Sequence, residues 1–106
     1  MLREVEYEDQ SYNLISKAML LITYYETDEL EPLYSLFESF KTYLARHKEI
    51  PNSRRRLYLN LIKFTRRLTK IIPKDKTSLE KIKKDIETTE GVANADWLKE
   101  KIAELE

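Results

Sequence analysis

Apolar side chains recur at intervals of three and four residues along most of the chain, which is the spacing of one face of an α-helix. The spacing breaks near "ETDELEP", "EIPNS", "IIPKDK" and "ETTEG". Each of these stretches contains a proline or a glycine, residues that interrupt helices. The pattern therefore predicts an all-α fold of four to five antiparallel helices, joined by short links into helical hairpins as a bundle or a repeat-like array.

The first helix is expected to begin at Asp9 or Ser11, both good N-caps, and to run to about Glu26. Leu20 and Tyr24 lie on one side of it. A wide arc on another side holds Leu14, Ile15, Ala18, Leu21, Ile22 and Tyr25. A helix that is apolar almost all round is buried on several faces or lacks a neighbour.

The second helix is expected from a cap at Thr27 or Asp28 to about His47, with Pro32 tolerated in its first turn. Its apolar stripe consists of Leu33, Leu36, Phe37, Phe40, Tyr43 and Leu44. The opposite face is small and weakly charged.

The third helix follows a cap at Asn52 or Ser53. Half of its circumference is apolar and comprises Leu57, Tyr58, Leu61, Ile62, Phe64, Thr65, Leu68, Ile71 and Ile72. The other half carries a set that we call the basic stripe, namely Arg55, Arg56, Lys63, Arg66, Arg67 and Lys70. Leu59 lies among these basic residues, which suggests a protein contact there.

Two shorter helices complete the pattern. "TSLE" is a capping box in which Thr77 and Glu80 begin the fourth helix. Gly91 stands where a left-handed C-terminal cap would need a glycine. Asn94 is expected to cap the last helix, whose apolar residues are Trp97, Leu98, Ile102 and Leu105.

The 106-residue length predicts a single helical domain over residues 1–106. The net charge of zero hides a strong asymmetry. Residues 1–40 carry nine acidic and two basic side chains. Residues 41–84 carry three acidic and fifteen basic side chains, and residues 85–106 carry seven acidic and two basic ones. The acidic ends can fold back onto the basic middle, or the middle can face an anionic partner.

The chain has no cysteine, which favours a cytoplasmic protein. Its densest apolar run, "AMLLITYY", is far shorter than the ~20 residues that span a bilayer. We therefore expect a soluble protein with no membrane partner.

Residue types that carry catalysis are scarce. His47 is the only histidine, and it lacks a spaced nucleophile or carboxylate partner, so we expect a half-buried histidine near a helix end. One histidine and no cysteine make a metal site improbable, and no glycine-rich loop exists to hold a phosphate or dinucleotide. We expect no enzyme activity and no cofactor.

The best candidate for binding is the basic stripe together with Leu59. Three interpretations are open: a solvated or internally paired face, a contact for a protein partner, and a phosphate-binding face for nucleic acid. The stripe lacks Asn or Gln pairs for base readout and aromatic residues for stacking, so nucleic acid is the less favoured partner.

One stretch of the chain is similar to a known group of proteins, namely the run "YYETDELEPLYSLFESFKTYLARHKEIPNSRRRLYLNLIKF". It resembles the C-terminal helical segments of large uncharacterised Bacteroidetes-type bacterial proteins, whose upstream parts are tetratricopeptide-like helical repeats. The resemblance extends over residues 12–105 and implies no activity. It implies a fragment of a longer helical-repeat protein, whose first helix packed on the missing repeats; a full-length chain is the alternative.

Taken together, these features predict a non-catalytic protein-interaction or scaffold module. The apolar surface of the first helix predicts a homodimer of the isolated chain. The alternative function is a nucleic-acid-binding helical domain that uses the basic stripe.

Overall fold

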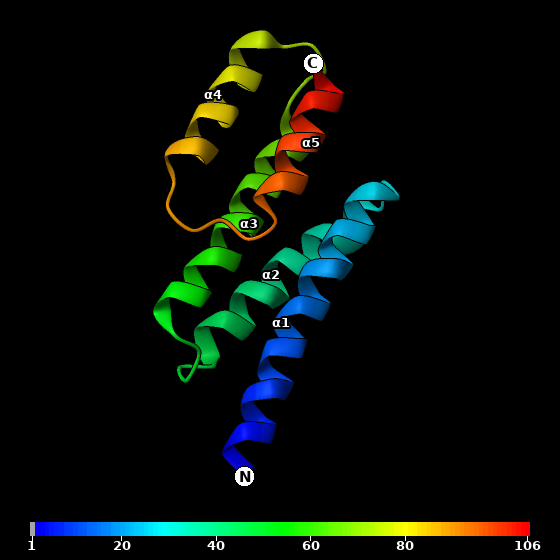
Figure 1. Ribbon diagram of the computed structural model, residues 1–106. Coiled ribbons are helices and arrows are strands. Elements are labelled where there is room, and N and C mark those ends of the chain that lie inside the picture. Colours follow the sequence, from blue (N-terminus) through cyan, green and yellow to red (C-terminus); the bar gives the residue numbers. More distant parts are fainter. Residues whose placement is uncertain (1) are drawn as a thin grey trace. The chain divides into compact units, whose positions relative to one another are not determined.

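The computed structural model describes the backbone of residues 2–106 and the side chains of residues 11–106. Over this part the chain forms helices and no strand, which confirms the all-α prediction (Figure 1). The five helices are α1 (Leu2–Glu26), α2 (Leu30–Arg46), α3 (Asn52–Lys70), α4 (Lys76–Thr88) and α5 (Ala95–Leu105).

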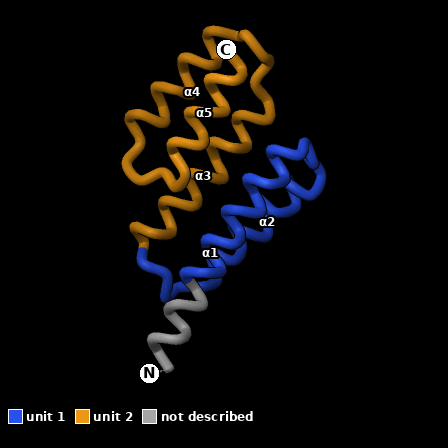
Figure 2. Tube along the Cα trace, turned by 45° about the vertical axis from the view of Figure 1, so that its right-hand side comes forward, with its two compact units in different colours: residues 1–51 blue, residues 52–106 orange. Residues whose placement is uncertain are grey.

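The helices divide into two compact units, which Figure 2 colours separately. Unit 1 is Met1–Pro51 and contains α1 and α2; unit 2 is Asn52–Glu106 and contains α3, α4 and α5. Pro51, which ends unit 1, disfavours a helical conformation at the residue before it and so separates α2 from α3. That residues 1–106 act as a single domain stays a prediction.

Unit 1 is a helical hairpin in which α1 packs against α2. The predicted stripe of α2 is buried at Leu33, Leu36, Phe37, Phe40 and Leu44. On α1 the buried side chains are Leu14, Ala18 and Leu21. Polar contacts also cross the hairpin. The Asn13 side-chain amide donates to the Tyr43 hydroxyl at 3.4 Å, and the Lys17 amine lies 4.7 Å from the centre of the Tyr43 ring.

The turn between α1 and α2 differs from the sequence expectation. Asp28 has a φ of 59°, and its N–H donates to the carbonyl of Tyr25, while the N–H of Glu29 donates to the carbonyl of Tyr24. These two bonds form a Schellman motif, which satisfies the last carbonyls of a helix. Asp28 therefore belongs to the C-terminal cap that follows α1. The N-cap of α2 is Glu29 rather than Thr27 or Asp28.

The first helix is also longer than predicted, because it begins at Leu2 and not at Asp9 or Ser11. A capping residue favours a helix start without requiring one, and helical residues before it leave it inside the helix. The side chains of residues 1–10 lie outside the described residues.

Unit 2 is a bundle of three helices in which each helix packs on the other two. Figure 1 shows α4 running opposite to α3 and α5. Apolar side chains from all three helices are buried: Leu61, Ile62, Phe64, Leu68, Leu79, Ile82, Ile86, Leu98 and Ile102. Ile72, which we assigned to the apolar half of α3, is instead 71% exposed, because α3 ends at Lys70 and the chain turns away.

The start of α4 lies at a different residue from the predicted one. The helix begins at Lys76, and its N-cap is Asp75 instead of Thr77. The Ser78 hydroxyl donates to the Asp75 carboxylate at 2.8 Å. The predicted capping box at Thr77 and Glu80 was therefore wrong, because Lys76 begins the helix and Thr77 lies inside its first turn.

The link between α4 and α5 is fastened to the beginning of α3. The N–H of Ala93 donates to the carbonyl of Leu57 at 3.0 Å, and the Asn60 side-chain amide donates to the carbonyl of Gly91 at 2.8 Å. Gly91 has the predicted left-handed backbone, with φ of 76°, but the C-cap of α4 is Thr89. Gly91 thus allows the link to turn toward α3 and does not cap the helix.

Candidate functional site

The basic stripe and Leu59 lie along α3, and their side chains have different environments. Arg56, Lys63 and Lys70 are exposed, as is Leu59 with 37% of its surface accessible. The three exposed basic residues are seven positions apart, so they lie on one side of the helix at intervals of roughly 10 Å. This half of the stripe is open to a partner.

The remaining basic side chains are held closer to the protein. Arg55 donates to the side-chain oxygen of Asn52 at 2.7 Å, and Arg66 is half-buried. Arg67 forms an ion pair with Asp85 of α4, with 2.8 Å between the guanidinium nitrogen and the carboxylate oxygen. The Arg67 guanidinium also lies 5.6 Å from the centre of the Phe64 ring. Part of the basic stripe is therefore paired within the protein, at Arg55 and Arg67.

The acid that pairs with Arg67 comes from the acidic C-terminal part of the sequence. Both side chains stay partly exposed, 31% for Arg67 and 39% for Asp85, so water screens their attraction and the pair contributes little stability. Its main effect is to fix the direction of the guanidinium. The sequence pattern did not identify this partner, because Asp85 is 18 positions away and meets Arg67 only through the packing of α4 on α3.

Tyr58, at the border of the apolar half of α3, is a titratable group whose pKa is shifted by its environment. Partial burial raises the pKa of its hydroxyl above the ordinary value of 10.0, and the nearby positive charge of Arg54 opposes this by lowering the pKa. Burial is the larger effect. Tyr58 is therefore a packing residue with a polar tip, and it has no feature of an acid or base working near neutral pH.

A second surface lies on α1, on the side away from its buried residues. We call it the α1 apolar stripe and define it as Tyr12, Ile15, Met19 and Leu20, which are 66%, 51%, 55% and 41% exposed. Tyr12, Ile15 and Met19 follow the i, i+3, i+7 spacing of one helix face. The helix is thus apolar on two sides, as the sequence predicted, and only one of them is covered.

Two members of the α1 apolar stripe were missed in the sequence pattern. Tyr12 and Met19 were not assigned to any face, because the pattern was dominated by the arc that includes Leu14, Ala18 and Leu21. The spacing of Tyr12, Ile15 and Met19 is a signal that could have identified them. Ile15, by contrast, was placed in the same arc as the buried residues and is half exposed.

His47 occupies the position expected for it. It is the C-cap residue of α2, it is half-buried, and its ring stacks on Tyr43 with 4.0 Å between ring centres. Its Nδ1 atom lies 2.9 Å from the Glu49 carboxylate. These contacts explain His47 as a structural residue at the end of a helix.

Among the described residues no three His, Asp or Glu side chains gather closely enough to hold a metal ion. No helix in the same part of the chain combines the length and apolar character that crossing a membrane requires.

Comparison of the chain with protein-family models, with curated proteins and with solved structures finds no match. The resemblance to Bacteroidetes-type helical-repeat proteins therefore stays a prediction.

Proposed function

We propose that this chain is a non-catalytic protein-interaction module whose contact surface is the α1 apolar stripe. The observation that carries the proposal is the exposure of Tyr12, Ile15, Met19 and Leu20 together on one helix whose opposite side is already buried. Single exposed apolar residues are common on protein surfaces, whereas a contiguous group of large ones marks an interaction site. Burial of such side chains drives association.

The occupant that we propose for the isolated chain is a second copy of α1 in antiparallel orientation. Charge along the helix supports this orientation. Residues 4–9 include four acidic side chains, whereas residues 11–25 have Lys17 as their single charge. Parallel pairing would place two acidic segments side by side, and antiparallel pairing moves them to opposite ends. The stripe itself lies in the uncharged stretch, where two copies can meet without repulsion.

Sedimentation equilibrium over a range of protein concentrations tests this proposal. We expect the natural chain to show a concentration-dependent increase in mass toward that of a dimer. The variant Ile15→Glu, Met19→Glu should stay a monomer, because a pair of contacting helices would then bury carboxylates.

The matched control is Ser35→Glu, Thr42→Glu, which adds the same charge at two exposed positions of α2. It should associate like the natural chain. A natural chain that stays a monomer at the highest concentration, or a control that loses association to the same extent, would contradict the proposal.

A second candidate function is nucleic-acid binding through the exposed half of the basic stripe. The observation that favours it is the seven-residue spacing of Arg56, Lys63 and Lys70, which gives one row of cations on α3. Fluorescence anisotropy of labelled duplex DNA and single-stranded RNA at two salt concentrations tests it. Salt-sensitive binding that is lost in Arg56→Glu, Lys63→Glu would support this function over the first one.

A further inference from the structure

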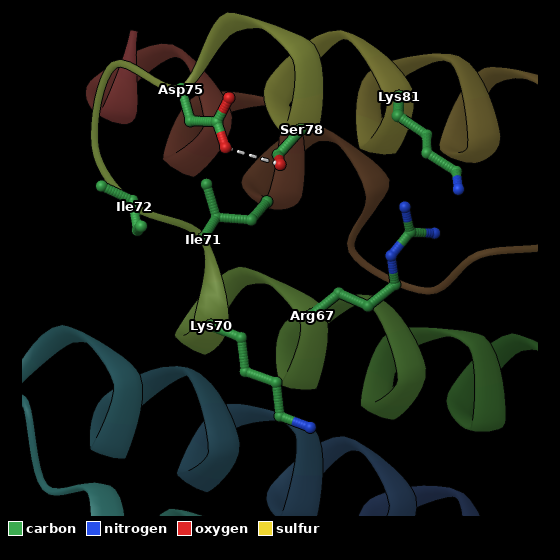
Figure 3. A pocket seen from close by; sticks show the side chains of 7 residues that line it. All are labelled: Arg67, Lys70, Ile71, Ile72, Asp75, Ser78 and Lys81. Atoms are coloured by element: carbon green, nitrogen blue, oxygen red, sulfur yellow. Dashed lines mark hydrogen bonds between the residues drawn. The ribbon is translucent and has the colours of Figure 1, made fainter.

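A cleft of about 400 Å³ lies in unit 2, where α3 ends and α4 begins. Its volume lies within the range of small-molecule sites. Figure 3 shows the side chains that line it. Arg67 and Lys70 come from α3, Ser78 and Lys81 come from α4, and the link between the helices supplies Ile71, Ile72 and Asp75.

Two positive charges face each other at one end of this cleft. Figure 3 shows the Arg67 guanidinium and the Lys81 amine pointing toward one another from α3 and α4. Asp85 engages one terminal nitrogen of Arg67, which leaves further N–H donors on the guanidinium. Lys81 has no ion-pair or hydrogen-bond partner among the described residues. Asp85 offsets part of the positive charge here, so an anion between Arg67 and Lys81 would be stabilised by the remaining guanidinium donors and by the amine of Lys81.

The other lining residues determine where in the cleft an anion can bind and which substituent the anion can have. The Asp75 carboxylate accepts from the Ser78 hydroxyl at the other end of the cleft, and its negative charge disfavours an anion there. Ile71 lies beside the Asp75–Ser78 pair, and Ile72, which is 71% exposed, lies further from Arg67 and Lys81 and forms an apolar edge. The amine of Lys70 points away from Arg67 and Lys81. A ligand would therefore place its charge between Arg67 and Lys81 and an apolar group against the isoleucines.

We propose that this cleft binds a small organic phosphate, a phosphate monoester with an apolar substituent. The guanidinium donors that Asp85 leaves available and the amine of Lys81 together suit the three acceptor oxygens and nearly two negative charges of a phosphate better than a carboxylate with one charge. Arginine adds a planar donor group that matches phosphate geometry. The site is separate from the α1 apolar stripe and does not depend on the proposed function.

Amide chemical shifts of the ¹⁵N-labelled full chain, titrated with phenyl phosphate, inorganic phosphate and benzoate at constant ionic strength, test the proposal. We expect saturable shifts at the amides of Ile72 and Ser78, with phenyl phosphate binding more tightly than the other two anions. Lys81→Gln should weaken phenyl phosphate binding at least about fivefold, because one charge-assisted contact is lost.

Lys84→Gln is the matched control, because it removes the same charge one turn further along α4 from a side chain that does not line the cleft. It should bind phenyl phosphate like the natural chain. Shifts that do not saturate, equal weakening in the two variants, or benzoate binding as tightly as phenyl phosphate would each overturn the proposal. Lys81 is exposed and unpaired in the described part of the chain, so its replacement leaves the fold intact.

Discussion

Four residues in the links between the helices have a left-handed backbone: Asp28, Lys74, Gly91 and Asn94, with φ of 59°, 69°, 76° and 56°. Gly91 alone of these lacks a Cβ atom, so it adopts this conformation without strain. Aspartate and asparagine tolerate it better than other residues do, because their short side chains bond locally. Lys74 has no such compensation, although its N–H donates to the carbonyl of Leu105 at 2.8 Å.

Exchanges at two of these positions should differ in their effect on stability. Gly91→Ala adds a Cβ atom 3.4 Å from a methyl carbon of Leu57 at a positive φ, and it should lower the free energy of unfolding by about 1–2 kcal/mol. Lys74→Gly should leave it unchanged or raise it by up to about 1 kcal/mol. Urea denaturation of both variants measures these changes. Destabilisation by Lys74→Gly as large as that by Gly91→Ala would show that the backbone conformation at Lys74 is unstrained.

The raised pKa of Tyr58 predicts a dependence of stability on alkaline pH. The folded state binds the hydroxyl proton more tightly than the unfolded state, whose tyrosine pKa is 10.0. Tyr58 therefore contributes its full share of stability below pH 10.0, and that share is lost as the pH rises through the folded pKa.

The variant Tyr58→Phe isolates this contribution, because phenylalanine does not titrate. The free energy of unfolding, measured at about pH 8 and about pH 11, should fall less in Tyr58→Phe than in the natural chain. An equal fall in both proteins would show that other groups, such as the remaining tyrosines and the lysines, cause the whole dependence.

Among the elements, the apolar periodicity of the sequence was enough to predict four to five helices, and the structure has five over the described residues. Proline at positions 32, 51 and 73 and the glycine at position 91 marked the regions near the links. The ends of the helices were harder to predict because several residues near each end are good caps and their preferences differ by only about 1 kcal/mol. Near the start of α4, for instance, three residues are good N-caps: Asp75, Thr77 and Ser78. In the structure Asp75 is the N-cap.

The choice of Asp75 over Thr77 is testable. Asp75→Ala removes the partner of Ser78 and a negative charge at the N-terminus of α4, so it should lower the free energy of unfolding by about 1 kcal/mol. Thr77→Ala, inside the helix and exposed, should change it by less than about 0.5 kcal/mol. Thermal denaturation of the two variants compares them. A larger loss for Thr77→Ala would restore the capping box that the sequence predicted.

The same limit applies to the candidate site. The basic stripe could be predicted because every residue belongs to one helix and the spacing alone places it on one face. Two other features could not be predicted from the sequence: the pairing of Arg67 with Asp85, and the cleft that includes Lys81. Both depend on how α4 packs against α3. The α1 apolar stripe was predicted in part, since periodicity identified a helix that is apolar all round without saying which side would be covered.

At the scale of the whole molecule, the chain divides into two units, each with its own buried side chains. Phe37 lies in the core of unit 1 and Ile82 in that of unit 2, and both are fully buried. We expect Phe37→Leu to reduce hydrogen-exchange protection in α1 and α2, and Ile82→Val to reduce it in α3 to α5, because local contacts stabilise each group of helices.

Mass spectrometry of exchange into deuterium, peptide by peptide, measures this separation. Equal loss of protection over residues 11–106 in both variants would show that the chain unfolds as one cooperative unit. That result would favour the single domain expected from its length.

We propose that the α1 apolar stripe is the surface through which this protein meets its partner, and that the partner of the isolated chain is a second copy. The absence of cysteine makes a direct test simple, since one cysteine can be introduced without competition. Ser16 is exposed and lies within the stretch of α1 that carries Tyr12, Ile15 and Met19. In an antiparallel pair this position approaches its copy near the middle of the contact.

The measurement is the rate of intermolecular disulfide formation in Ser16→Cys under mild oxidation, compared with Ser35→Cys on the exposed face of α2. We predict that Ser16→Cys forms a covalent dimer much faster than Ser35→Cys, and that adding Ile15→Glu, Met19→Glu removes the difference. Equal rates at the two positions would contradict the claim that α1 is the contact surface.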